Sequence, residues 1–297
     1  MSPSYDNCML CARKCGVNRN NGLIGYCKSG NLPTVARAAL HHWEEPVISG
    51  ARGSGTIFFS GCSLACVYCQ NKDISRSSVG KGLTPDMISD AMLRLESDGA
   101  HNINFVTPTH FMPSVREAII LAKSKGLSVP IVYNTSSYDT PESIMALSGL
   151  VDIYLPDMKY YLGKTAAALS NAPDYPAVAR NAVAEMVRQC PKPVIDEGGL
   201  MRSGVIVRVL LLPSHVAEAK LIVKYLYETY GDDIYVSLMN QYTPMPDMVP
   251  PLNRRVTHEE YGELVDYAER IGVINGFTQE FGTASESFIP PFDNTGI

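Results

Sequence analysis

Short apolar runs alternate with longer amphipathic segments from residue 56 to about residue 240. The runs are rich in Ile, Val, Phe and Tyr, are bounded by Gly, Pro or Asp, and do not alternate between polar and apolar positions. Such runs predict strands that are buried on both faces of a parallel sheet. The six predicted strands are Thr56–Ser60, Ile103–Val106, Pro130–Asn134, Asp152–Leu155, Val205–Leu211 and Ile234–Leu238.

Helix signals fill the segments between these strands. Thr84-Pro85 and Thr140-Pro141 are each typical of an N-cap followed by a proline in the first helical turn. Apolar residues between 87 and 95 then recur on one helical face, and Gly99 offers a stop. Further helices are predicted at about 115–125, 176–189, 215–229 and 257–271.

Six strands with helices between them predict an α/β fold, a partial (β/α)6 TIM-like barrel of parallel strands. Right-handed crossovers curl such a sheet toward a barrel, and six units fall short of the eight that close one. A doubly wound open sheet is the alternative. In both architectures ligands gather at the carboxyl ends of the strands, so candidate site residues should follow strands directly.

Three regions differ in character along the chain. Residues 1–45 hold four cysteines and no long periodic element, which predicts a small Cys-rich metal-binding module. Residues 46–245 are the predicted partial barrel, and residues 246–297 are a Pro-rich stretch, one helix and an irregular tail.

Composition narrows the class of protein. The chain has 297 residues, 45% of them hydrophobic, which suffices for one large core. No apolar run is long enough for a transmembrane helix and no signal peptide is evident, so we expect a soluble, cytoplasmic protein without a membrane partner. The net charge of −5 and the lack of a basic run argue against nucleic acid as a partner.

The eight cysteines are clustered: four lie between residues 8 and 27, three between 62 and 69, and Cys190 is alone. Clustered cysteines in a cytosolic chain of this size indicate metal or redox chemistry rather than disulfides. Cys190 is interpreted as a small buried apolar residue.

The segment Gly61–Asn71, GCSLACVYCQN, directly follows the first predicted strand. It places Cys62, Cys66 and Cys69 in the spacing C-x3-C-x2-C. Three thiolates this close together can bind three corners of an iron–sulfur cubane, for which four cysteines are the usual full set. One iron is then open to an external ligand, and an open coordination position is typical of a reactive metal site.

Other uses of these three cysteines are less favoured. Zinc could bind them with one distant ligand, but structural zinc prefers paired C-x2-C units. An electron-carrying ferredoxin site needs a fourth nearby cysteine, and none occurs between residues 70 and 189.

The motif, with the aromatic Tyr68 before its third cysteine, resembles that of the radical S-adenosylmethionine (SAM) superfamily. The form CVYCQN is similar to the branch of glycyl-radical-enzyme activating enzymes, such as pyruvate formate-lyase activating enzyme. The segment NCMLCARKCGVNRNNGLIGYC, with EEPVISG and GTIFFSGC after it, is similar to uncharacterised Fe–S proteins homologous to that activating enzyme. The resemblance extends over roughly residues 7–240.

The resemblance implies a cofactor set and a reaction. Cys62, Cys66 and Cys69 hold a [4Fe–4S] cluster, SAM binds the open iron through its amino and carboxylate groups, and Tyr68 lies beside the adenine. Reductive cleavage of SAM gives methionine and a 5′-deoxyadenosyl radical that abstracts hydrogen from the substrate. The electron comes from a low-potential donor such as flavodoxin or ferredoxin, and the open iron makes the enzyme oxygen-sensitive and suited to anaerobic conditions.

The resemblance also concerns the end of the second strand. Family members carry Gly-Gly-Glu there, which meets the SAM amino group, whereas this chain has Thr107-Pro108-Thr109-His110. The hydroxyls of Thr107 and Thr109, or His110, could accept hydrogen bonds from an ammonium group without supplying a carboxylate's charge. The alternative is a loop that only leads into the next helix.

The next two strand ends also match the activating enzymes. Asn134-Thr135-Ser136-Ser137 stands where those enzymes carry Asp-Thr-Asn-Gly, which helps bind SAM and a monovalent cation, and Asn134, Thr135 and Ser136 are the implied cofactor contacts. Asp157 and Lys159 resemble their Asp-Leu-Lys. The match implies that Asp157 contributes to the cation site or the peptide-facing wall, and that Lys159 points toward SAM or substrate. A solvated ion pair is the alternative.

Arg208 lies inside an apolar run of the fifth strand. A buried arginine demands a partner, which we expect to be the SAM carboxylate or Asp157. Asn240–Tyr242 follows the sixth strand as a polar loop that faces the cofactor, and His41–Glu45 is interpreted as a polar loop with one packed Trp rather than a cavity mouth.

The N-terminal cysteines have the spacing C-x2-C-x3-C-x11-C. Four thiolates of this kind could close a tetrahedral zinc site or hold a second Fe–S cluster. A structural role is favoured narrowly over a cluster that feeds electrons or binds substrate. The four residues are Cys8, Cys11, Cys15 and Cys27.

Three functions follow from these observations. The leading one is a radical SAM enzyme of the glycyl-radical-activase type, whose partner presents a glycine loop to the barrel mouth. The second keeps the chemistry and changes the substrate to another peptide, protein or small molecule. The third, a non-catalytic Fe–S protein or electron carrier, is disfavoured by the missing fourth cysteine near residues 62–69.

Overall fold

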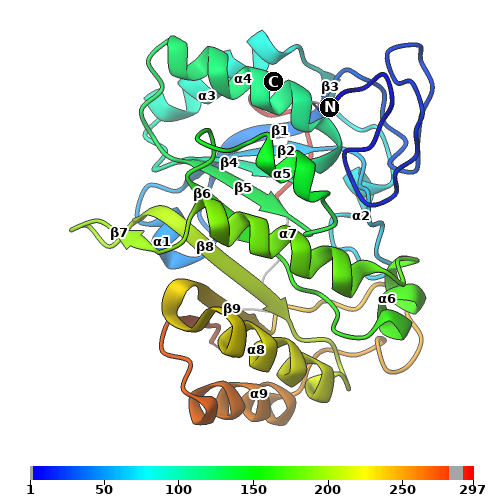
Figure 1. Cartoon of the computed structure of the whole chain (residues 1–297), viewed down its shortest axis with the longest axis vertical. Helices are drawn as coiled ribbons and strands as arrows, with labels where there is room; N and C mark the ends of the chain where they lie inside the picture. The colour runs from blue at the N-terminus through cyan, green and yellow to red at the C-terminus, as the bar shows by residue number, and fades with distance from the viewer. Residues whose placement is uncertain (1–2, 281–289) are drawn as a thin grey trace.

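A mostly parallel sheet forms the centre of the computed structural model, which describes residues 3–280 and 290–297 (Figure 1). Seven neighbouring strands of the described chain run parallel to one another. In order across the sheet they are β2 (Ser54–Phe59), β4 (Ile103–Val106), β5 (Ile131–Thr135), β6 (Ile153–Pro156), β8 (Met201–Leu210), β9 (Tyr235–Met239) and β10 (Gly276–Thr278).

The order of these strands in space follows their order along the chain. A doubly wound sheet would reverse direction at a switch point, so this order confirms the barrel-like alternative. The hydrogen-bonded path runs from β10 to β3 (Lys81–Gly82) without closing on itself within the described ranges. The fold is therefore an open, partial barrel, and the first six parallel strands coincide with the six predicted ones.

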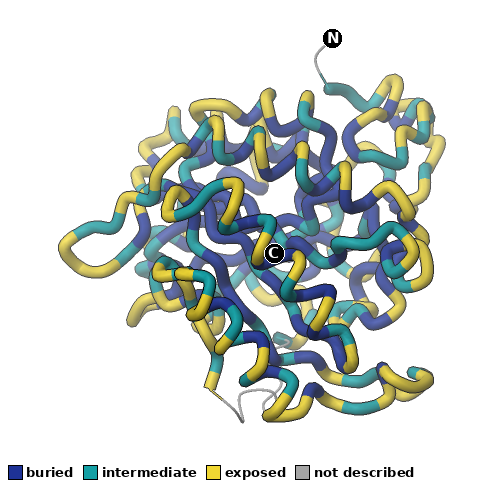
Figure 2. Tube along the Cα trace, turned by 60° about the horizontal axis from the view of Figure 1, so that its bottom comes forward, coloured by how far each residue is buried: buried dark blue, intermediate teal, exposed yellow. Residues whose placement is uncertain are grey.

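Helices connect the strands and cover the outer face of the sheet, while the strands form the buried interior (Figures 1 and 2). Two predicted N-caps are confirmed: Thr84 Oγ1 accepts from the Met87 amide at 3.3 Å, and Thr140 Oγ1 accepts from the Ser143 amide at 3.4 Å. The α-helices are α1 (Pro46–Ser49), α2 (Lys72–Ser75), α3 (Pro85–Ser97), α4 (Met112–Ser124), α5 (Pro141–Met145), α6 (Gly163–Ser170), α7 (Tyr175–Gln189), α8 (Val216–Tyr230) and α9 (His258–Ile271), with 3-10 turns η1 (Thr109–Phe111) and η2 (Gly231–Asp233). No helix of the described ranges is long and apolar enough to span a membrane.

Some strands were not predicted. The longest, β1 (Thr34–His41), pairs antiparallel with β2 and extends the sheet. Its sequence TVARAALH holds three alanines and an arginine, which have weak strand propensity, so no strand pattern stands out. The others, β3, β7 (Val194–Ile195) and β10, have two or three residues and are too short to leave a pattern.

The end of the described chain lies along β1. The Ala38 amide donates to the Thr295 carbonyl at 3.0 Å, and the Asn294 amide donates to the Ala36 carbonyl at 3.2 Å. Lys81 Nζ donates to the Ile297 carbonyl at 2.8 Å. Residues 294–297 therefore cover the edge of β1 that faces away from β2.

The N-terminal segment (residues 3–33) packs against the helical side of the barrel rather than standing apart. The Ala12 amide donates to the Tyr138 carbonyl at 3.2 Å, and Cys11 forms an isolated β-bridge with Asp139. Thr140 and Ser143, at the start of α5, donate to carbonyls at Met9 and Leu10.

Thr84→Ala removes the side-chain cap of α3 and leaves the Met87 amide without that acceptor. We expect the free energy of unfolding to fall by about 1 kcal/mol, as urea denaturation would measure. Ser97→Ala, at an exposed position near the end of the same helix, serves as the control and should change stability by less than about 0.5 kcal/mol. Equal losses in the two variants would contradict the capping role.

Candidate active site

One cavity of about 440 Å³ opens at the carboxyl ends of the parallel strands. Its walls come from the residues that follow β2, β4, β5, β6, β9 and β10 and from the loop before β2. The site residues predicted from the sequence that line it are Cys62, Cys66, Tyr68, Cys69, Thr107, Asn134, Thr135, Ser136, Asp157, Lys159 and Arg208. Segments far apart in the chain thus meet where the barrel fold requires ligands to bind.

The three cysteines of the C-x3-C-x2-C motif lie on the loop after β2. The loop turns sharply because Gly61 (φ 86°) and Ala65 (φ 59°) adopt left-handed backbone conformations just before Cys62 and Cys66. The Leu64 amide donates to Cys62 Sγ at 3.4 Å. Backbone donors to sulfur favour the thiolate form that binds metals.

The electrostatic environment of these thiols favours the binding of positively charged iron. Burial, followed by repulsion from Cys69 and Cys66, raises the pKa of Cys62 to about 12. Burial and Cys66 likewise raise the pKa of Cys69. Three thiolates in this pocket are therefore unfavourable until bound iron compensates their charge.

Within the described ranges, no three His, Cys, Asp or Glu side chains could hold a metal ion together. A [4Fe–4S] cluster needs no such convergence, because each cysteine binds a different iron of the cube.

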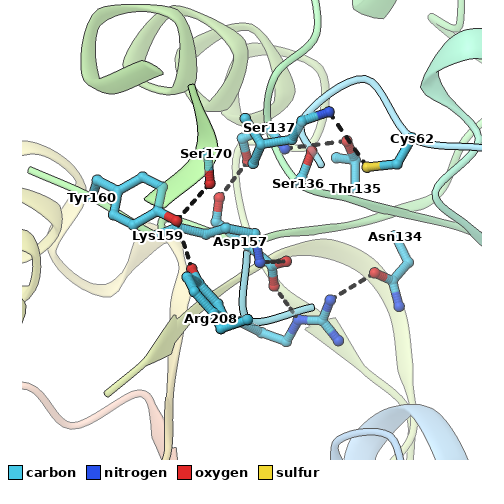
Figure 3. Close-up of polar contacts among 12 residues, drawn as sticks. Cys62, Asn134, Thr135, Ser136, Ser137, Asp157, Lys159, Tyr160, Ser170 and Arg208 are labelled. Carbon is cyan, nitrogen blue, oxygen red and sulfur yellow. Dashed lines mark hydrogen bonds and ion pairs between the residues drawn. The ribbon is translucent and has the colours of Figure 1, made fainter. Parts of the chain in front are cut away.

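A chain of buried charges crosses the cavity floor around Arg208 (Figure 3). Arg208 Nε donates to Asp157 Oδ1 at 2.8 Å, and Arg208 Nη2 donates to Asn134 Oδ1 at 2.6 Å. Lys159 Nζ donates to the other oxygen of Asp157 at 2.7 Å. Arg208 thus has the second of its two expected partners, Asp157, and the group joins the ends of β5 and β6 to β8.

Opposite charges decide which of these groups ionise. Burial would raise the pKa of Asp157, but the charges of Arg208 and Lys159 outweigh it and hold that pKa below its ordinary value. Burial would lower the pKa of Lys159, but Asp157 and then Cys66 raise it. The ammonium group of Lys159 is therefore charged and interacts with the cysteine loop.

Glu44 belongs to this charge network, although no sequence pattern had marked it as a site residue. Glu44 Oε2 lies 3.3 Å from Arg208 Nη1, and its other oxygen accepts from Asn104 and Asn134 at 3.1 and 3.3 Å. Trp43, which was expected to be packed, is 59% exposed, and His41–Glu45 lines the cavity. Two adjacent glutamates before the first parallel strand were the available signal, but their partners lie up to 164 residues away.

The pKa values of both glutamates are raised above the ordinary range. Burial is the main cause in each case, and it outweighs the opposing charge of Arg208. Glu45 Oε2 is buried without a hydrogen-bond partner in the described structure. The cavity therefore holds more carboxyl groups than its cations neutralise.

Thr109 lies outside the cavity lining. It is 1% exposed and its hydroxyl lies 3.2 Å from that of Thr135, which donates to Asp139 Oδ2 at 2.5 Å. Tyr133 donates to the other Asp139 oxygen at 3.1 Å. The contact between Thr109 and SAM stays a prediction, whereas Thr107 (φ 59°) does face the cavity.

Tyr68 lies at the cavity wall within a cluster of tyrosines. Its hydroxyl accepts from Tyr160 at 2.8 Å, and the Tyr160 hydroxyl lies 2.6 Å from that of Ser170. The ring of Tyr242, in the loop after β9, is 6.1 Å from the ring of Tyr68. These contacts fix the ring that the resemblance assigns to the adenine.

The N-terminal cysteines lie outside this cavity lining. Cys8, Cys11 and Cys27 are buried, and Cys15 is partly buried. Cys190 is also buried, and its thiol contacts the Asp152 carbonyl at 3.4 Å, as expected for a packed thiol.

Comparison with known proteins identifies the class. Residues 56–160 match the model of the radical SAM superfamily. The chain is 30% identical over 277 residues to the uncharacterized protein MJ0674 of Methanocaldococcus jannaschii, covering 90% of this chain and 75% of that one. The protein therefore belongs to the radical SAM superfamily, whose cofactors are a [4Fe–4S] cluster and SAM.

Solved structures agree with the fold. Streptococcus suis SuiB bound to S-adenosylmethionine superposes with a TM-score of 0.51 at 11% identity, over 74% of this chain and 48% of that one. SuiB bound to its precursor peptide SuiA gives a TM-score of 0.50, also at 11% identity, over 74% and 46%. The chain thus spans about half the length of SuiB.

His110 provides a pH-dependent prediction. It is 1% exposed, its Nε2 lies 2.8 Å from the Ser60 carbonyl, and burial lowers its pKa from 6.5 to about 4. The unfolded chain takes up this proton near pH 6.5, so stability is lost as the pH falls from 6.5 toward 4. The gap between the two pKa values corresponds to about 3 kcal/mol.

The measurement is urea denaturation at pH 7 and pH 4. His110→Gln should lose about 3 kcal/mol less than the wild type on acidification, and His258→Gln, at an exposed position, should behave as the wild type does. Parallel losses in all three proteins would show that His110 carries none of the acid sensitivity.

Asp157→Asn leaves two buried cations without their shared carboxylate. Their side chains are 14% and 15% exposed, so we expect a loss of about 3 kcal/mol in the free energy of unfolding. Asp86→Asn removes an exposed partner of Lys125 and should change little. If Asp157→Asn were as stable as Asp86→Asn, the network would have no structural importance.

Proposed function

We propose that this radical SAM enzyme abstracts a hydrogen atom from a peptide segment that enters the cavity, as activases of glycyl radical enzymes do with their partner proteins. One observation carries the proposal: the cysteine loop and the charge network around Arg208 face the same cavity at the carboxyl ends of the strands. A site that brings a cluster, a cofactor and a substrate together needs such an arrangement.

Different residues of this chain would bind the cluster and SAM. Cys62, Cys66 and Cys69 would hold the cluster, and Tyr68 would contact the adenine of SAM. When bound, the cluster and SAM together supply a one-electron cleavage that yields a hydrogen-abstracting 5′-deoxyadenosyl radical. Glu44 offers the carboxylate charge that the segment after β4 lacks, so it is a candidate acceptor for the SAM amino group.

The charge network around Arg208 would orient the bound ligand. Arg208 and Lys159 share Asp157, and their cationic groups can each face an anionic group in the cavity, such as the SAM carboxylate. Because the network is buried and hydrogen-bonded, it would hold these cations in place before the ligand binds, which reduces the ordering cost of binding.

A peptide substrate is supported by the sequence resemblance. The cavity of about 440 Å³ is in the range of small-ligand sites, so a protein substrate would insert only a short segment there. The match of CVYCQN and of Asp157-Met158-Lys159 to activating enzymes favours a glycine loop as that segment. SuiB, with a similar fold, has been crystallised with a precursor peptide, and peptide modification of another kind is the second candidate.

The test is anaerobic formation of 5′-deoxyadenosine. After reconstitution with iron and sulfide, reduction with dithionite and addition of SAM, chromatography should detect 5′-deoxyadenosine from the wild type and none from the Cys62→Ala, Cys66→Ala, Cys69→Ala triple variant. Cys190→Ala, which removes a buried cysteine far from the motif in sequence, is the matched control and should retain wild-type yield.

Absence of product from a wild-type chain that carries a full complement of iron would overturn the assignment. To test the substrate, glycine-containing peptides deuterated at Cα would be added; transfer of deuterium into 5′-deoxyadenosine supports the peptide proposal. Transfer only from small-molecule substrates would contradict it.

A further inference from the structure

The four N-terminal cysteines form a second thiol cluster next to the first. Cys11 interacts electrostatically with each of Cys27, Cys8 and Cys15, so the other three thiols lie around that of Cys11. None of them forms a disulfide. Backbone turns hold them in place: the Gly16 amide donates to the Cys8 carbonyl, and the Lys14 amide donates to the Cys11 carbonyl, both at 3.0 Å.

Nitrogen donors point at these sulfurs. The Tyr26 amide donates to Cys15 Sγ at 3.4 Å, and Arg19 Nη1 lies 3.9 Å from Cys8 Sγ. Hydrogen bonds to cysteine sulfur are a recurring feature of iron–sulfur sites and tune their reduction potential.

Arg19 is a buried cation that needs a negative partner. It is 1% exposed, donates to the carbonyls of Gly30 and His110, and stacks on the rings of Tyr5 and Phe111. No ion pair found among residues 3–280 and 290–297 includes it. A buried charge is costly without compensation, and four metal-bound thiolates with a net negative charge would provide it.

The position of the thiols favours iron–sulfur over zinc. Four thiolates can close a tetrahedral zinc site or hold a cubane, in which each cysteine binds its own iron. Only the cubane can take up and pass on an electron, because Zn²⁺ has no redox chemistry. A thiol set in contact with the loop of the SAM cluster therefore fits iron–sulfur better.

The N-terminal segment is fastened directly to the loop of the SAM cluster. Arg13 Nε donates to the Ser63 carbonyl at 2.9 Å and Arg13 Nη2 to the Leu64 carbonyl at 3.3 Å, both between Cys62 and Cys66. A Cβ at Gly61 would lie 2.9 Å from the Cys27 carbonyl oxygen, so the residue before Cys62 is in contact with Cys27. The two cysteine sets are therefore linked by adjacent backbone.

We propose that Cys8, Cys11, Cys15 and Cys27 hold a second [4Fe–4S] cluster that relays electrons to the SAM cluster. The donor is an acidic, low-potential electron-transfer protein of the ferredoxin or flavodoxin class. It loses one electron, the second cluster goes from its 2+ to its 1+ state, and it returns to 2+ as the SAM cluster is reduced by the same electron. No proton moves and no bond forms or breaks in the relay.

The outer surface of the segment fits such a donor. Residues 3–33 contain four basic residues and one acidic residue, Asp6, although the whole chain has a net charge of −5. Lys14 and Lys28, each next to a cysteine in the sequence, are exposed, and the apolar side chains of Leu23 and Ile24 in the same segment are 55% and 59% exposed. A segment that exposes both basic and apolar side chains is complementary to an acidic partner.

Iron counting tests the site independently of SAM cleavage. The anaerobically reconstituted wild type should carry about eight iron ions per chain, and the Cys62→Ala, Cys66→Ala, Cys69→Ala variant should keep about four, with an electron paramagnetic resonance signal of a reduced cubane. Because this variant leaves the N-terminal segment intact, failure of the proposed function does not affect the result. One zinc ion per chain in place of that signal would overturn the proposal.

A comparison of two reductants tests the relay, which rests on the proposed function. The Cys11→Ser, Cys15→Ser variant should cleave SAM as the wild type does when dithionite, a small molecule, is the reductant. With reduced ferredoxin as the donor, its rate should fall at least tenfold, while Cys190→Ala should show no loss with either reductant. Equal ferredoxin-driven rates in the variant and the wild type would contradict the relay.

Discussion

The position of Arg208 inside an apolar strand constrains the whole cavity. Its guanidinium is 14% exposed, so it must be compensated within the barrel, and Asp157, Glu44 and Asn134 all turn toward it. These partners come from three different segments of the chain. They lie together because the buried positive charge of Arg208 needs a carboxylate and hydrogen-bond acceptors around it. The carboxyl ends of the central strands therefore meet around a fixed charge arrangement, and the cavity forms above it.

The parallel strands could be predicted because each is a local pattern. β4 was predicted with both ends correct, and the others were shifted by a few residues at most, since apolar runs between Gly, Pro and Asp depend on near neighbours alone. β1 was not predicted, because its alanine and arginine residues weaken the strand pattern and its burial arises from pairing with β2. The strand was therefore determined by tertiary contacts, to which sequence propensity is insensitive.

The site residues also fall into those that local sequence signals predict and those that only tertiary contacts reveal. Cysteine spacing is a local signal, so Cys62, Cys66 and Cys69 could be picked out with the strand ends beside them. Glu44 could not, because its importance arises only when the fold brings Arg208 to it. Thr109 shows what sequence position alone leaves open: its place after β4 predicts a ligand contact, and the structure adds that its hydroxyl lies 3.2 Å from that of Thr135, next to Asp139.

The residues that cover β1 have a consequence for association. An open barrel leaves strand edges with unpaired backbone groups, and such edges are templates for pairing with another chain. At β1 those groups are already bonded to Asn294 and Thr295, and the Gly296 backbone lies against Ala38 so closely that a side chain there would collide with its carbonyl. Two copies of the molecule therefore cannot extend their sheets into one another along this side, and self-assembly through continuous β-pairing is blocked there.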